Sequence, residues 1–503
     1  MMPAESFRQS PASDEAATMQ DGAAHPPADA MLFPTVDFAV FFVVVFAIAW
    51  LIRPWHFWWR VFLVAASWFF YGFWEPKFVL LLIGSTAFNW AVGRDLAAMR
   101  TPEGLTRFGR WFLGFGIAAN LLTLGWFKYY GFFVEDVAGL IERFGVDLPL
   151  PLLQVTLPVA ISFFTFHAIS YLVDIARGDC EPLSPLDFAL YLSFFPHLVA
   201  GPIVRVTEFA PQIRAPLRER VIDAAPAFTL IVAGLFKKVV ISTYLAGEIA
   251  DPVFASPASH SALENLFGVY AYAVQIFADF SGYTDIAIGC ALLLGIQFPQ
   301  NFDSPYRAWS LQDFWRRWHM TLSRWLRDYL YIPLGGNRGP KWFVYRNLFL
   351  TMLLGGLWHG AAWTFVAWGA IHGAGLVLER EVRARNRWLR GAAAKAVGWF
   401  VTFHLVCFAW IFFRAETFGA AWEVITRIAT AWGEPSPAVT PLLAAVIAGS
   451  IAAQFLPKDL FRRFEVAYSE LAPAAQAAML AVALVLIDAL GPEGVAPFIY
   501  FQF

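Results

Sequence analysis

Long apolar runs, separated by short basic or Pro/Gly-rich stretches, fill most of this 503-residue chain. A helix needs about 20 apolar residues to cross the hydrocarbon core of a bilayer. The runs therefore predict an all-α polytopic membrane protein. The candidate spans are 36–52, 60–75, 78–95, 111–133, 152–175, 187–204, 224–246, 264–296, 345–378, 396–413, 440–456 and 475–490.

Two of these runs, 264–296 and 345–378, are too long for a single crossing of about 20 residues. Each is either one long tilted helix or two helices joined by a break. We therefore expect roughly eleven to thirteen membrane segments, some of them re-entrant.

The region 297–347 does not fit a simple helix bundle, because it is basic and rich in Trp and Tyr. Within it, residues 311–331 have a helical spacing of large side chains: Phe314, Trp318, Leu322, Trp325 and Tyr329. This spacing predicts an amphipathic helix in the membrane interface, or one that dips into the membrane from the cytoplasmic side. The following IPLGGNRGP stretch predicts a turn.

The ends of the chain differ from its centre. Residues 1–30 are rich in Ala, Pro, Asp and Ser, and we expect a disordered tail there. The first apolar run follows directly after Met31, which predicts Met31 as the native start. Residues 31–490 form a single multi-helix domain, and 491–503 form an aromatic C-terminal tail.

Composition agrees with the membrane interpretation. The chain is 59% hydrophobic and 15% charged, whereas soluble domains carry about 25% charged residues. Three basic clusters are placed in the cytoplasm by the positive-inside rule, so they give no support for nucleic-acid binding. The clusters are Arg94, Arg100, Arg107 and Arg110; Arg205, Arg214, Arg218 and Arg220; and Arg380, Arg383, Arg385, Arg387, Arg390 and Lys395. The three cysteines have no metal-ligand spacing.

Three histidines stand in contexts that favour chemistry: His319 in FWRRWHMTLSRW, His359 in GGLWHGAAW and His372 in WGAIHGAG. An ionisable residue at membrane depth is costly and marks a functional site by default. Each of the last two precedes the second glycine of a small-xxx-small pair, which lets another helix approach closely. Equally, each is consistent with a buried histidine that hydrogen-bonds a neighbouring helix.

His319 follows Arg316 and Arg317, and both positive charge and burial favour a neutral imidazole that can act as a general base. The same basic-aromatic segment is also consistent with contacts to lipid headgroups.

Asp279 and Asp285 lie inside a long apolar run. They either orient an imidazole or line a polar path, or they staple a broken helix, which we favour slightly. Lys237 and Lys238 end an apolar run, and we expect them to snorkel.

With these residues collected, the chain resembles the membrane-bound O-acyltransferases, and within them the bacterial alginate O-acetyltransferase branch. The matching stretches are DFSGYTDIAIG, NFDSPYRAWSLQDFWRRWHMTLSRWLRDYLYIPLGGNRG, GGLWHGAAWTFVAWGAIHG, ISFFTFHAISYLVDIARG and FPHLVAGPIVR. His167 and His197 stand where many relatives have Gln, so neither is given a role.

The resemblance implies helices around a central funnel or tunnel, an essential His359 and a second important histidine, His319. The further candidates for lining the tunnel or orienting the site are Asp279, Tyr283, Asp285, Arg316, Trp358 and His372. The resemblance also implies an acyl donor on the cytoplasmic side, either acetyl-CoA or an acyl carrier, and it implies no bound cofactor and no metal. Periplasmic polysaccharide-acetylating partners and a location in the bacterial inner membrane are implied in the same way.

The chain ends in FIYFQF. Taken alone, these aromatics predict an interface anchor. In the related D-alanylation system, a small partner protein ends in an F-x-Y-x-x-F pattern, which Phe498, Tyr500 and Phe503 reproduce here. About ten residues separate the last span from Tyr500, and at ~3.3–3.6 Å per residue they reach about as far as the ~30 Å hydrocarbon core. The resemblance therefore suggests Tyr500 as an acyl relay.

Two other functions compete with acetylation of alginate. Related proteins acetylate peptidoglycan, cellulose or other exopolysaccharides, or D-alanylate teichoic acid. A secondary transporter or flippase would favour paired half-helices and a midplane ion site, but the chain has no inverted sequence repeat.

Overall fold

The computed structural model describes residues 31–142, 156–199, 201–216, 222, 224–385, 391–492 and 498–499. In these residues, the regular structure is helical apart from one two-stranded hairpin, so the predicted all-α class is confirmed. The tail 1–30 and Tyr500 lie outside the described residues, as do Arg218, Arg220, Arg387 and Arg390.

The α-helices are α2 (Val36–Leu51), α3 (His56–Gly72), α4 (Pro76–Ala98), α5 (Arg107–Glu142), α6 (Ile161–Arg177), α7 (Pro185–Ser193), α8 (Phe195–Leu198), α9 (Val206–Arg214), α10 (Ala224–Leu235), α11 (Thr243–Leu245), α12 (Asp251–Ala255), α13 (Ala262–Leu293), α14 (Leu311–Trp315), α15 (Met320–Leu326), α16 (Lys341–His359), α17 (Trp363–Arg385), α18 (Ala392–Arg414), α19 (Phe418–Thr430), α20 (Pro441–Ala453), α21 (Lys458–Ser469) and α22 (Pro473–Leu490). The π-helical turns are η2 (Phe236–Ser242), η3 (Ala246–Ala250) and η6 (Arg327–Tyr331). The 3₁₀ turns are η4 (Pro257–Ser259) and η5 (Pro305–Arg307), and β1 (Arg100–Thr101) pairs with β2 (Gly104–Leu105).

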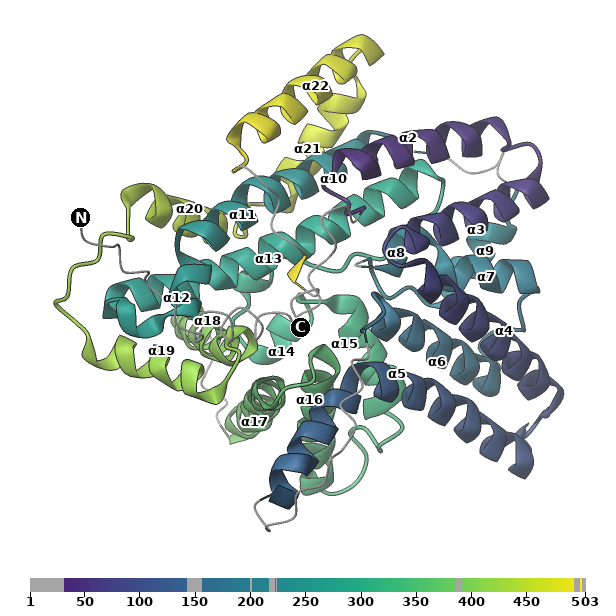
Figure 1. Ribbon diagram of the computed structural model, residues 1–503, viewed down its shortest axis with the longest axis horizontal. Helices are drawn as coiled ribbons and strands as arrows, with labels where there is room; N and C mark the ends of the chain where they lie inside the picture. The colour runs from purple at the N-terminus through teal and green to yellow at the C-terminus, as the bar shows by residue number, and fades with distance from the viewer. Residues whose placement is uncertain are drawn as a thin grey trace, which may run out of the picture.

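Helix α13 runs through the middle of the molecule, and most of its side chains are buried (Figure 1). It is one continuous helix of 32 residues, which decides between the two possibilities for 264–296. Its first turn is capped by Ser261 and Glu264, which bond each other's backbone N–H groups.

The other long run, 345–378, is two helices. Helix α16 ends at His359, and α17 begins at Trp363. The two pack closely because glycines face each other: a Cβ on Gly356 would lie 2.3 Å from the Phe365 carbonyl oxygen, and one on Gly369 would lie 2.5 Å from that of Met352. The predicted close approach at these glycines is confirmed.

The prediction of one helix over 311–331 is wrong. Helix α14 ends at Trp315, α15 begins at Met320, and η6 continues from Arg327. Two backbone hydrogen bonds to the preceding loop interrupt the helix, from Asp303 N–H to the Arg317 carbonyl and from Met320 N–H to the Asn301 carbonyl, both 2.9 Å. The helical spacing of aromatics is real, but those side chains pack inward on both sides of a break. The turn predicted after them is present, with Gly335 and Gly336 at positive φ.

Several described helices are suited to a bilayer. Four are long and apolar enough to cross it: Ala224–Ala255, Ala262–Leu293, Ala392–Arg414 and Pro473–Leu490. The pair Pro441–Ala453 and Lys458–Ser469, bent by 89°, adds a fifth if it is one broken span. Helix α22 lies at the edge of the molecule with nearly all its apolar side chains uncovered (Figure 1). The chain is therefore a multi-pass membrane protein, and the higher count of eleven to thirteen segments stays a prediction.

The prediction of snorkelling is wrong for Lys238, and Lys237 is only partly exposed. Lys238 is fully buried and forms an ion pair with Asp279, and Lys237 Nζ lies 2.6 Å from Asp285 Oδ2. Because a buried ammonium needs a compensating charge, the two pairs join η2 to α13. The carboxylates thus serve the contact between these helices.

Candidate active site

His359 is the last residue of α16, and its side chain is buried among aromatic rings. The imidazole centroid lies 5.0 Å from those of Trp358 and Trp368 and 5.3 Å from that of Phe413. Burial among apolar groups disfavours the imidazolium form. Burial therefore favours the neutral imidazole, which is the form that can accept a proton.

His319 stands at the break between α14 and α15, in the left-handed conformation (φ 42°), which is uncommon for a residue other than glycine. Its ring is fully buried. Its Nδ1 lies 3.2 Å from the side-chain oxygen of Asn301, which also accepts hydrogen bonds from Thr321 N–H (3.2 Å) and Thr321 Oγ1 (2.9 Å).

These contacts fix the tautomer of His319. The Thr321 N–H can only donate, so the Asn301 atom facing it is the oxygen, and that oxygen can only accept. His319 Nδ1 must then carry the hydrogen, which leaves the lone pair on Nε2. Nε2 is buried and makes no hydrogen bond to any residue that the structure describes. His319 therefore presents an unengaged basic nitrogen in the interior.

One indole lies against both histidines. The ring centroid of Trp358 is 5.0 Å from that of His359 and 6.3 Å from that of His319, and the indole stacks on Phe166 at 4.9 Å. The structure thus brings together the two histidines that sequence analysis singled out, although they are 40 positions apart in the chain.

His372 lies one layer behind this pair. Its Nδ1 accepts a hydrogen bond of 3.3 Å from Trp315 Nε1. Its ring is 4.8 Å from that of Trp368, which in turn contacts His359. His372 is therefore placed to fix the aromatic wall around His359.

The C-terminal segment reaches the same region. Phe498 and Ile499 are buried, and the Ile499 N–H donates to Asp279 Oδ2 at 2.8 Å. The Phe498 ring lies 4.3 Å from that of Tyr283 and 5.8 Å from that of Phe280. In Figure 1, this short yellow segment lies between α13 and α15.

Phe280 connects the C-terminal segment to the histidines, because its ring also lies 4.7 Å from that of His319, edge-on. Asp279 and Tyr283 therefore form part of the surface that binds Phe498 and Ile499. Asp285 lies apart from them and bonds Lys237.

Arg316 lines a cavity of about 570 Å³ between α14, α15, α16 and α17. Five arginines and one carboxylate face it: Arg316, Arg324, Arg327, Arg380, Arg383 and Glu379. Arg324 pairs with Glu208, and Arg383 pairs with Glu379. The Arg316 side chain is exposed and makes no hydrogen bond or ion pair within the described ranges. The cavity is thus suited to an anionic ligand, for which Arg316 has its donors available.

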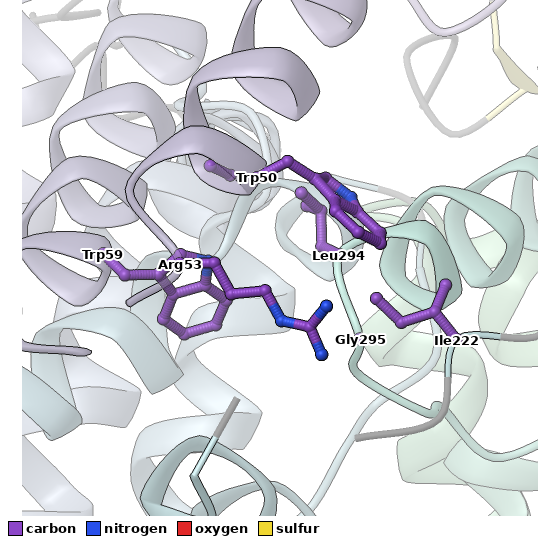
Figure 2. Close-up of a pocket in the computed structure, with 7 residues that line it drawn as sticks. Trp50, Arg53, Trp59, Ile222, Leu294 and Gly295 are labelled. Atoms are coloured by element: carbon purple, nitrogen blue, oxygen red, sulfur yellow. The ribbon is translucent and has the colours of Figure 1, made fainter. Parts of the chain in front are cut away.

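A second cavity, at the end of α13, is too small for a substrate. Its volume is about 10 Å³, space for about one water molecule. Figure 2 shows the Arg53 guanidinium pointing into it between Trp50 and Ile222. Within the described residues, no group of three or more His, Cys, Asp and Glu side chains is placed to hold a metal ion.

Sequence reasoning missed four residues of this region. Asn301 and Trp368 contact the histidines, and Lys128 and Tyr129 donate hydrogen bonds to the last backbone carbonyls of α16. Lys128 had a visible signal, since it is an ionisable residue inside the apolar run 111–133. Asn301 had none, because its role depends on a contact across a break that the helical spacing concealed.

The structure thus places two buried histidines at helix ends inside an all-α membrane protein, a setting suited to chemistry within the membrane. Comparison with known families agrees: the model of the membrane-bound O-acyltransferase family, MBOAT, matches residues 160–418, which include His319, His359 and His372. The chain belongs to this family and is an O-acyltransferase. This membership argues against the transporter alternative.

Curated relatives carry related activities in their names. The chain is 44% identical to the probable alginate O-acetylase AlgI of Pseudomonas aeruginosa over 368 residues, which are 72% of this chain and 68% of that protein. It is 43% identical to the probable AlgI of Azotobacter vinelandii over 371 residues, 72% and 71% of the two chains. It is 40% identical to the peptidoglycan O-acetyltransferase of Helicobacter pylori over 393 residues, 73% of each chain.

Proposed function

We propose that this enzyme takes an acetyl group from a cytoplasmic donor and passes it across the bacterial inner membrane to an exported polysaccharide, foremost alginate. The names of the similar AlgI proteins support the substrate. The observation that carries the proposal is the buried pair of histidines, His319 and His359, against the single indole of Trp358. Periplasmic polysaccharide-acetylating proteins complete the transfer, and membrane lipids surround the helices.

In the proposed reaction, His359 is the general base. It takes the proton of the acceptor hydroxyl as the hydroxyl oxygen bonds to the acetyl carbonyl carbon. The bond from that carbon to the donor's sulfur then breaks, and the leaving thiolate takes the proton back from the imidazolium. His319, with its Nε2 lone pair directed into the interior, orients the donor.

The experiment for His359 compares His359→Gln with the wild type in cells that lack their own O-acetyltransferase. Acetyl esters on the exported polysaccharide are measured by mass spectrometry, and the amount of enzyme in the membrane is measured in parallel. Loss of a general base lowers the rate by about 10²–10⁴-fold, so we expect no detectable acetylation at normal enzyme levels. Wild-type acetylation in this variant would refute the catalytic role.

The donor site is assigned to the arginine-lined cavity of about 570 Å³. Acetyl-CoA, or a phosphopantetheine group on a carrier, brings phosphates that guanidinium groups bind well. The cavity includes Ser323 and Met320, the latter next to His319 in the chain. The support for this donor site is the positive charge of the arginines, and the donor binds there as a substrate and not as a resident cofactor.

Arg316→Ala tests the donor site in the purified enzyme with acetyl-CoA as the probe. We expect a KM raised about tenfold or more and a smaller change in kcat, because a phosphate contact contributes to binding. Arg94→Ala is the control, since Arg94 is exposed and outside the cavity. Equal KM values for the two variants would contradict this assignment.

Tyr500 is proposed as the relay for the acetyl group. The support is the adjacent segment: Ile499 bonds Asp279, and Phe498 contacts Phe280 beside His319. The phenol oxygen would attack the donor's acetyl carbon while His359 takes its proton, giving an acetyl-tyrosine ester and a free thiol. A polysaccharide hydroxyl then receives the acetyl group and returns the proton to the phenol.

A trapped intermediate tests the relay. Mass spectrometry of the C-terminal peptide after incubation with acetyl-CoA should show one added acetyl group in the wild type and none in Tyr500→Phe. Normal polysaccharide acetylation by Tyr500→Phe would eliminate the relay and leave the C-terminal aromatics as an anchor.

The alternative substrate is peptidoglycan, because the Helicobacter pylori relative carries that name and covers 73% of this chain. Acetyl analysis of both polymers from the same cells separates the two. Esters on peptidoglycan alone would replace alginate as the substrate.

A further inference from the structure

The end of α16 poses a problem of unsatisfied carbonyls. The last four carbonyl oxygens of any α-helix have no partner within the helix, and in a bilayer each unsatisfied group is costly. In α16 these are the carbonyls of residues 356–359. The backbone does not continue into a C-cap turn here, because Gly360 is extended (φ −156°, ψ 153°).

Helix α5 supplies the missing donors from two consecutive residues. Lys128 Nζ donates to the carbonyl oxygens of Trp358 and His359, both at 2.8 Å. The Tyr129 hydroxyl donates to the carbonyl of Leu357 at 2.6 Å. Lys128 and Tyr129 form what we call the α5 cap, which satisfies three of the four terminal carbonyls.

The α5 cap combines charge with geometry. A cation at the C-terminal end of a helix interacts favourably with the helix dipole. The Lys128 ammonium also lies 6.0 Å from the Trp358 ring centroid, within the range of a cation–π contact. Figure 1 shows the later part of α5 beside α16, and the Phe132 ring lies 5.5 Å from that of Trp363 at the start of α17.

The α5 cap affects the orientation of the proposed general base, because His359 is the terminal residue of α16. An imidazole in the middle of a helix is held by turns on both sides, but His359 has a helical turn only before it. Its own carbonyl and that of Trp358 are held by Lys128. The direction of the His359 ring and the place of the shared indole therefore depend on α5.

We propose that Lys128 and Tyr129 are positioning residues that hold His359 in its reactive orientation. This inference rests on the proposed role of His359 as general base. The cap lies outside the segment 160–418 that the family model matches, and the two residues act through the backbone of α16 without touching the reacting atoms.

Three variants of the full-length enzyme in lipid nanodiscs test the proposal, with acetyl-CoA as the probe and CoA release as the readout. Lys128→Met removes the cation at similar length, and we expect kcat to fall by roughly 10²-fold, as for an ångström-scale displacement of a reacting group. The KM for acetyl-CoA should stay within about twofold, since the cap does not contact the arginine-lined cavity. Tyr129→Phe removes one neutral hydrogen bond and should lower kcat by up to about tenfold.

Lys128→Arg should recover most of the lost kcat, because a guanidinium can also donate to two carbonyls. A merely structural lysine would lower the amount of folded enzyme without this split between kcat and KM. Lys77→Met is the control. Lys77 is also a lysine, but it is exposed and pairs with Glu75.

The outcomes separate the two proposals. If His359→Gln is inactive and both Lys128→Met and Tyr129→Phe turn over at the wild-type rate, the positioning role is refuted and His359 stands. If His359→Gln is active in the same assay, the general-base assignment is refuted, and the positioning role that rests on it is refuted with it. If Lys128→Met does not fold, Tyr129→Phe decides, because it deletes a single oxygen: an unchanged kcat overturns the proposal.

Discussion

Two long apolar segments of similar composition take opposite forms in this protein. Helix α13 is continuous over 32 residues, and α16 and α17 are separated by a break. The charges of α13 are neutralised inside the fold, with Asp279 and Asp285 each paired to a lysine. The break instead leaves His359 at a helix end, with carbonyls that another helix must satisfy.

The difference teaches where chemistry can sit in a membrane interior. Within the intact helix α13 every backbone group is bonded, and Asp279 and Asp285 are matched by lysines and serve as structural contacts. At a break the backbone is exposed, and side chains from several helices converge on it. Both proposed reactive histidines lie at such breaks, His319 before α15 and His359 at the end of α16.

The largest effect is expected in the intact helix. Asp279→Leu leaves Lys238 buried without its carboxylate, and removing one partner of a buried pair costs about 3–5 kcal/mol. We expect a large fall in the thermal unfolding midpoint in detergent. Asp285→Leu is the matched variant, and it should cost less because Lys237 is partly exposed and can be hydrated.

The double variant Asp279→Leu/Lys238→Met sharpens this result. Replacing both charges should restore most of the stability, but Ile499 still loses the acceptor of its N–H. Full stability with low polysaccharide acetylation would separate the anchoring of the C-terminal segment from the packing of α13. Full stability with wild-type acetylation would show that the anchor is dispensable.

At the first break, Asn301→Leu should lower kcat by roughly 10²-fold, because His319 Nδ1 loses its acceptor and the ring its fixed tautomer. Asn301→Asp keeps an acceptor oxygen at the same place and should retain more activity. The kcat for CoA release from acetyl-CoA measures both. Equal rates for the two variants would show that the tautomer of His319 is unimportant.

At the contact between α16 and α17, Gly356→Ala places a methyl group 2.3 Å from the Phe365 carbonyl oxygen. Overpacking of this kind costs about 1–3 kcal/mol, so the unfolding midpoint and the fraction of monodisperse protein should fall. Gly125→Ala in α5 is the control, since its Cβ would meet no heavy atom within 4 Å. A similar midpoint in both variants would argue against the tight α16–α17 contact.

The smallest effect concerns pH, at the turn after α15. Burial disfavours the charged form of Asp328, but hydrogen bonds from Arg327 and Arg205 outweigh it, so the pKa of Asp328 lies below its usual value. The carboxylate therefore contributes stability above the unfolded pKa of about 3.9, and this contribution is lost as pH falls through the lower folded pKa.

Asp328→Asn measures that contribution. Its unfolding midpoint should lie below that of the wild type by a constant amount from about pH 8 to pH 5, and the gap should close below about pH 4. A gap that does not change with pH would mean that the aspartate acts through shape and not through charge.

The sequence alone determined the membrane class, the all-α fold and the close glycine contacts, and it singled out the two histidines that the structure brings together. These follow from composition, from run length and from long motifs, all of which are local properties of the chain. Local periodicity also had a limit: it predicted one helix over 311–331, where hydrogen bonds to 301 and 303 impose a break at His319.

Only the tertiary structure decided which charges are neutralised and which groups hold the histidines in place. Lys238 and Asp279 are 41 positions apart, and Lys128 and His359 are 231 apart. No helical period links residues at such separations, because their contact depends on how whole helices pack. The physical reason is that a buried cation or a helix end must find its partner wherever the fold brings one within hydrogen-bonding distance.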